Sequence, residues 1–99
     1  MFKKFQNLLQ KFPLLNFLGN KYYLKAKNLF NLGDYKKAKE IIYEVIKYYK
    51  NYDTLYLIAL INLKIEDYTQ LEEVIYEIID IYGLDDKLQN DFSDFFNTI

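Results

Sequence analysis

YYLKAKNLFNLGDYKKAKEIIYEVIKYY, residues 22–49, and LYLIALINLKIEDYTQLEEVIYEIIDIY, residues 55–82, are two copies of one block, offset by 33 positions. Without gaps, 11 of the 28 aligned positions are identical, and seven of the other 17 exchange one apolar residue for another. A period of about 20 to 50 residues is typical of stacked repeats, which form extended binding surfaces rather than buried reaction chambers. The duplication therefore predicts the kind of protein, but it does not identify a partner.

The second half of each copy has a helical period. Apolar residues recur every three or four positions over 35–49 and again over 68–82, which indicates two amphipathic helices. The first halves, 20–32 and 53–65, have the length and pattern of helices as well. Each copy is therefore predicted to be a pair of antiparallel helices joined by a very short turn.

The predicted turns carry capping signals. Asp34 and Asp67 stand where an N-cap belongs, and Gln70 is placed to complete a capping box with Asp67. Gly33 supplies the positive φ that a tight helix–helix turn needs. Glu66 occupies the matching site in the second copy, so that turn is expected to be strained or to have another shape.

Two more helices are predicted outside the copies. An apolar stripe over 2–12 ends at Pro13. Gly83 is a helix stop, and Asp85 or Asp86 can cap a last helix over 86–97 that carries Leu88, Phe92, Phe95 and Phe96. The sequence thus predicts one all-α domain with six helices, at 2–12, 20–32, 35–49, 53–65, 68–82 and 86–97.

Composition excludes most catalytic chemistry. The 99 residues are 52% hydrophobic and 19% aromatic, which is far too apolar for a disordered segment. His, Cys and Arg are absent, so imidazole bases, thiolate nucleophiles, His or Cys metal sites and guanidinium clamps are all ruled out. No glycine-rich phosphate loop is present. We therefore expect a protein that is not an enzyme and has no cofactor or metal.

The first copy resembles the tetratricopeptide repeat. The resemblance rests on a small first-helix residue, Ala26, then LGDY at 32–35 and Ala38 at the second-helix packing position. In the second copy Ala59 matches, Leu71 replaces the second alanine, the family's late proline is missing from both copies, and the period is 33 rather than 34. The resemblance implies a short α-α superhelix, or solenoid, with repeats at 20–49 and 53–82 between flanking helices.

The same resemblance implies a binding face. In such repeats the first helix of each pair lines the concave face, where peptides or partner helices bind. Carried over position by position, the partner-binding residues here are Asn20, Tyr23, Lys27, Phe30, Asn31, Tyr56, Leu60, Leu63 and Lys64. The alternative for Tyr23 and Tyr56 is simple packing. The Lys/Asn set that grips a terminal carboxylate in chaperone-binding members is not reproduced.

The helix predicted at 53–65 is apolar almost all round. Between Leu55 and Ile65 only Asn62 and Lys64 are strongly polar, so the helix needs cover on every side. Three partners could cover its apolar surface: the last helix, a second copy of the chain, or the apolar face of a client.

The charges of the two halves are opposite. Residues 1–50 hold eleven lysines against three acidic residues (+8), and residues 51–99 hold two against eleven (−9). This asymmetry has three possible explanations. The two copies can pair with each other, Lys39 with Glu72 and Lys47 with Asp80. Otherwise the charges serve an external partner, or chains associate head to tail with one another. A nucleic-acid partner is not expected, because Arg is absent and the lysines of 35–49 alternate with acids.

These observations predict a cytoplasmic, non-catalytic protein–protein interaction module, an adaptor or small chaperone-like protein. It would bind a peptide or helix on the face formed by 20–32 and 53–65. One alternative is a structural homo-oligomer. The other is a peripheral membrane protein anchored by 2–12, where Lys3, Lys4 and Lys11 oppose a Phe/Leu face. The same segment can instead cap the first repeat. No signal peptide or membrane span is expected.

Overall fold

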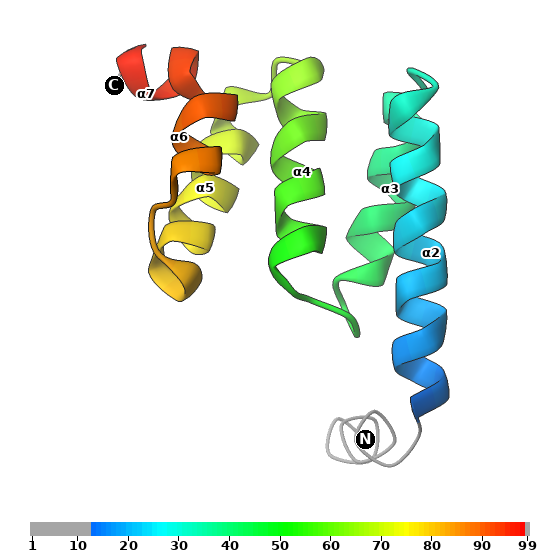
Figure 1. Ribbon diagram of the computed structural model, residues 1–99. Coiled ribbons are helices and arrows are strands. Elements are labelled where there is room, and N and C mark those ends of the chain that lie inside the picture. The colour runs from blue at the N-terminus through cyan, green and yellow to red at the C-terminus, as the bar shows by residue number, and fades with distance from the viewer. Residues whose placement is uncertain (1–12, 99) are drawn as a thin grey trace.

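The computed structural model describes residues 13–98, and over these residues it contains six helices and no strand (Figure 1). This confirms the all-α class. The predicted helix over 2–12 lies outside the described residues. The six helices are α2 (Pro13–Asn31), α3 (Tyr35–Val45), α4 (Tyr52–Lys64), α5 (Tyr68–Tyr82), α6 (Asp86–Asp91) and α7 (Ser93–Thr98).

The duplicated block folds as two helix pairs. α2 packs against α3, α4 packs against α5, and the two pairs meet where α3 packs on α4. Figure 1 shows the pairs standing side by side, with α6 in front of α5 at the end far from α2. The copies of the sequence therefore correspond to copies of one supersecondary unit.

The two interhelical turns have the same shape. Asp34 N donates to Leu29 O and Asp67 N donates to Asn62 O, both at 2.9 Å, which is the six-to-one bond of a Schellman helix end. The residue before each Asp has positive φ, +86° at Gly33 and +60° at Glu66. The second turn is thus not reshaped to suit Glu66; instead Glu66 adopts the conformation that favours glycine.

The predicted N-caps are confirmed, but the capping box is in a different place. Asp34 accepts from Lys37 N (3.3 Å) and Asp67 from Gln70 N (3.2 Å). The Gln70 side chain does not return to Asp67; it accepts from the Tyr43 hydroxyl at 3.2 Å.

The full capping box opens α4. There Asn51 Oδ1 accepts from Thr54 N and Thr54 Oγ1 accepts from Asn51 N, each at 2.9 Å.

Three predicted boundaries are wrong. The helix expected from residue 20 begins at Pro13, because proline suits the first helical position, where its missing N–H has no partner to lose. The helix expected to reach residue 49 ends at Val45, where bonds such as Lys47 N to Glu44 O tighten the chain into a turn. The helix expected at 86–97 is interrupted at Phe92, whose φ is −118° and ψ is 30°.

The remaining boundaries agree. α5 spans 68–82 as predicted and ends at Gly83 (φ +84°), while α4 is displaced by one residue from the predicted 53–65. Asp85, the first of the two proposed caps, accepts from Leu88 N at 2.7 Å.

The core runs along α4. Eight of its thirteen residues are buried, and α3, α5 and α6 supply the neighbouring side chains. Phe92 and Leu88 of the C-terminal segment are themselves 1% and 0% exposed. Of the three proposed covers for this helix, the chain's own C-terminal segment is the one that the structure shows. Small or aliphatic residues lie fully buried at the matched packing positions of the two pairs: Ala26, Ala38, Ala59 and Leu71.

The predicted charge pairs between the copies are wrong in register. Lys39 pairs with Asp67 (3.5 Å), not Glu72, and Lys50 pairs with Glu77. Lys47 pairs with Glu44 near the end of α3, at 2.9 Å, rather than with Asp80. The residues that face each other are therefore 27 or 28 positions apart rather than 33.

Candidate partner-binding groove

A hollow of about 160 Å³ lies between α2 and α4, and α6 borders it at one side. The first helices of the two copies form its walls, as the sequence predicts. Its lining combines apolar, aromatic and charged side chains: Tyr23, Lys27, Phe30, Asn31, Asp53, Tyr56, Leu57, Leu60 and Lys87. We call this hollow the groove.

The base of the groove is built around Tyr56. Its side chain is only 6% exposed, its ring stacks on Tyr52 (centroids 5.6 Å apart), and the edge of Phe92 meets it at 5.6 Å. Lys87 Nζ lies 4.4 Å from the ring centroid, and the hydroxyl donates to Asp91. Tyr56 therefore fastens α6 onto α4, which makes it a packing residue beneath the groove.

The side of the groove away from Tyr56 is accessible to solvent. Leu60 and Phe30 are half-buried and Lys27 is exposed, so apolar and cationic groups are both within reach of a ligand. Burial raises the pKa of Tyr23, and the Asp53 carboxylate raises it further. The Tyr23 phenol therefore stays protonated at neutral pH and is a hydrogen-bond donor at the rim of the groove.

Six of the nine predicted partner-binding residues lie together in this groove. They are Tyr23, Lys27, Phe30, Asn31, Tyr56 and Leu60. The structure does not bring in Leu63 or Lys64, because Leu63 is half-buried against the core and Lys64 is exposed at the end of α4. Asn20, also carried over from the resemblance, lines a different hollow on the outer side of α2.

Three lining residues were missed by the sequence reasoning: Asp53, Leu57 and Lys87. A signal for Asp53 was present, since it stands 33 positions after Asn20 and 33 before Asp86. The sequence gives no signal for Lys87, because it predicts 86–97 only as a flanking helix that can cover α4.

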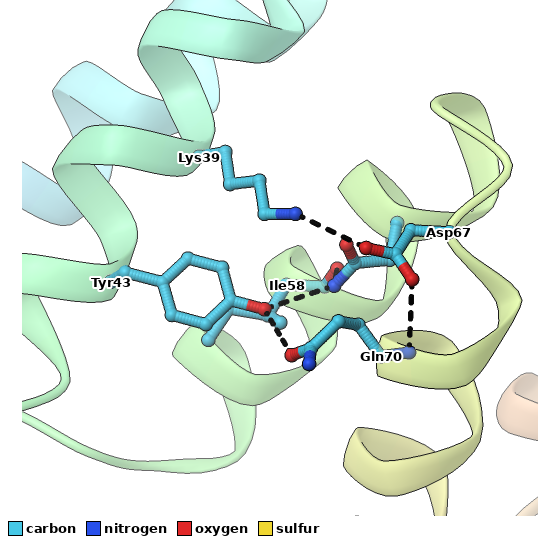
Figure 2. Close-up of polar contacts among 6 residues, drawn as sticks. Lys39, Tyr43, Ile58, Asp67 and Gln70 are labelled. Atoms are coloured by element: carbon cyan, nitrogen blue, oxygen red, sulfur yellow. Dashed lines mark hydrogen bonds and ion pairs between the residues drawn. The ribbon is translucent and has the colours of Figure 1, made fainter.

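A second polar cluster lies on the opposite side of α4, between α3 and α5 (Figure 2). Asn62 Nδ2 donates to Tyr43 Oη at 3.2 Å and to Ile58 O at 3.1 Å, and the Tyr43 hydroxyl donates to Gln70 Oε1. Asn62 is fully buried, and its Oδ1 has no hydrogen-bond partner among residues 13–98. The cluster links three helices and fixes their register, which is a structural role.

Other kinds of site are not found in the described part of the chain. Residues 13–98 contain no group of three or more carboxylates placed to hold a metal ion. None of the helices described is long and apolar enough to cross a membrane.

Comparison with protein-family models, curated proteins and solved structures finds no match. The groove is therefore the feature from which a function can be inferred.

Proposed function

We propose that this chain is a non-catalytic protein–protein interaction module that binds a peptide or helix in the groove between α2 and α4. The observation that carries the proposal is the convergence of six predicted residues, from two sequence copies, on one hollow. The pairing of helices supports a short tetratricopeptide-like superhelix, with the first helix of each copy on the binding face. A cytoplasmic location is in keeping with the absence of cysteine.

Binding would be an equilibrium process without covalent chemistry. Leu60 and Phe30 offer apolar contact, while Lys27 and Lys87 offer positive charge at separate points of the rim. This combination suits an amphipathic segment that carries at least one carboxylate. Since aromatic and apolar anchors supply most of the affinity at such interfaces, we expect the loss of Leu60 to matter most.

The test selects peptides from a displayed library of amphipathic segments against the full chain. Leu60→Glu places a charge in the groove at a half-buried position and should lower the affinity of selected peptides at least about tenfold. Ile81→Glu is the matched control, since Ile81 is 56% exposed on α5 and does not line the groove. Tyr56→Ala is unsuitable here, because Tyr56 is buried and its loss would disturb α6.

Equal peptide binding by the folded Leu60→Glu variant would place the binding surface elsewhere. Failure to select any peptide, together with light scattering that shows a stable dimer or larger assembly, would favour the alternative of a structural homo-oligomer.

A further inference from the structure

The opposite charges of this protein are separated in space as well as in sequence. α2 has three lysines and no acidic residue, whereas α5 has four acidic residues and no basic one. Figure 1 shows α2 at one end of the row of helices and α5, with α6 in front of it, at the other end. The described part of the chain therefore has a basic helix at one end and an acidic helix at the other.

Ion pairs within the chain use few of these charges. Among residues 13–98, no lysine of α2 forms an ion pair, and Glu77 is the one acidic residue of α5 that does. Lys21 and Lys25 are exposed on α2, and Glu72 and Asp80 are exposed on α5. These four charges are therefore available to another molecule.

The outer side of α2 combines its lysines with exposed apolar side chains. A hollow of about 630 Å³ lies along it, and five exposed residues on one side of the helix are among those that line it: Phe17, Lys21, Leu24, Lys25 and Leu32. We call these five residues the basic face. Phe17 is 64% exposed and Leu32 81%, and an apolar patch of this kind is typical of an interaction site. Because the lysines lie among apolar side chains, a fitting partner offers apolar contact together with negative charge.

The exposed side of α5 has this chemistry. Tyrosine and carboxylate alternate there at intervals of four, so they form one row along the helix: Tyr68, Glu72, Tyr76 and Asp80. We call these four residues the acidic row. All four are exposed, and the tyrosine rings supply a large contact area beside the carboxylates. The acidic row therefore matches the basic face in apolar character and opposes it in charge.

We propose that the chain associates head to tail, with the acidic row of one chain docked on the basic face of the next. A symmetric contact would bring like charges together, whereas a contact between the two different surfaces pairs lysines with carboxylates. Each added chain leaves one basic face and one acidic row free at the ends of the assembly, so further chains can be added.

The inference is independent of the groove. The hollow along the basic face and the groove share no lining residue, and the acidic row belongs to a helix that does not line the groove. Chains joined in this way would keep their grooves open, so an assembly would present several binding sites in a row.

The test reverses the charges of each surface in the full chain. Lys21→Glu/Lys25→Glu makes the basic face acidic, and Glu72→Lys/Asp80→Lys makes the acidic row basic. Each double variant alone should associate at least about tenfold more weakly than the parent in sedimentation velocity at low salt, because like charges then meet. An equimolar mixture of the two variants should associate again, because each supplies the charge that the other has lost.

A matched control separates the position of the charges from their sum. Lys36→Glu/Lys64→Glu changes the net charge as much as Lys21→Glu/Lys25→Glu does, but at exposed lysines of α3 and α4 that do not line the hollow. This variant should associate as the parent does. Circular dichroism should show the same helix content for every variant, since all six substituted positions are exposed.

A second measurement locates the contact without changing any charge. The chain has no cysteine, so Leu24→Cys marks the basic face and Tyr76→Cys marks the acidic row with a single thiol each. In a mixture of the two variants, a short bismaleimide should join position 24 of one chain to position 76 of another more readily than it joins like positions.

Three results would overturn the inference. The first is a full chain that stays monomeric at low salt up to about 1 mM, even if an acidic peptide binds the basic face, since that face would then serve another protein. The second is a mixture of the charge-reversed variants that stays monomeric. The third is cross-linking of 24 to 24 in preference to 24 to 76, which would indicate a symmetric contact.

Discussion

At the scale of single residues, the two turns show how one backbone shape is reached with different residues. Gly33 and Glu66 both have positive φ at the same point of the repeat, and both are followed by an Asp N-cap. A side chain in this region of φ,ψ costs about 1–2 kcal/mol, whereas glycine has no Cβ to clash. The second copy therefore retains its turn at a cost that the first copy avoids.

Glu66→Gly should stabilise the protein by about 0.5–1 kcal/mol in urea or thermal unfolding, after the entropy gained by the unfolded chain is subtracted. Glu72→Gly, an exposed position inside α5, is the control and should destabilise by a similar amount. A loss of stability in Glu66→Gly would show that the turn is not strained.

Gly19 matters for a different reason, which is close approach. It is buried within α2, and a Cβ atom built on it would overlap Cβ and Cγ of Tyr49. Gly19→Ala should therefore cost about 1–3 kcal/mol, although alanine is the better helix former. Asn20→Ala, at the exposed neighbouring position, should cost nothing measurable by the same denaturation assay.

The hydrogen bond from the Tyr52 hydroxyl to Asp85 (2.9 Å) makes stability depend on alkaline pH. Burial, this bond and nearby carboxylates raise the pKa of Tyr52 from 10.0 to about 12. The folded state thus favours the protonated phenol, so this contribution is complete below pH 10 and is lost as the pH rises towards 12.

Tyr52→Phe should therefore differ in unfolding free energy from the parent at pH 8, and the difference should shrink between pH 10 and 12. Tyr76→Phe, at a 47% exposed site on α5, is the control. A difference that is constant with pH would remove the role given to this bond.

At the scale of the helices, the sequence predicts some boundaries and not others. α5 is correct at both ends, because Asp67 is a local start signal and Gly83 a local stop signal. α3 is four residues shorter than its apolar pattern, since Ile46 and Tyr49 pack half-buried against the core from positions that follow the end of the helix. The period of apolar residues indicates which side chains face the core. Whether the backbone at those residues is helical depends on tertiary packing.

The C-terminal segment is interrupted at a position that the repeat explains. Phe92 aligns with Ala26 and Ala59, which are fully buried where the helices of each pair are packed. Phe92 carries a large ring at this position, and α6 ends there. The ring lies against Tyr56.

Phe92→Ala should destabilise the protein by about 3 kcal/mol, because it removes a fully buried ring. Hydrogen exchange should quicken first in residues 86–98, while α2 and α3 keep their protection. Asn90→Ala, at an exposed site of α6, is the control. Uniform loss of protection across all helices would show that the C-terminal segment is not a separate layer.

At the scale of the whole molecule, the duplicated block predicts the groove better than it predicts the charges. Six groove residues follow from the resemblance to the tetratricopeptide repeat, which implies that the first helices of successive pairs share the binding face. The ion pairs do not follow from position in the repeat, because a long lysine side chain can pair with any carboxylate within its range. Lys39 pairs with Asp67, and Lys50 pairs with Glu77. These partly exposed pairs contribute little stability.

The central claim, that the groove binds a partner segment, is tested most directly by NMR. A peptide selected against the full chain is titrated into labelled protein, and backbone amide shifts are mapped onto the structure. We predict that the largest shifts lie at Tyr23, Lys27, Leu60 and Lys87, which line the groove from three helices. Shifts confined to the exposed face of α5, around Tyr76 and Ile81, would contradict the claim.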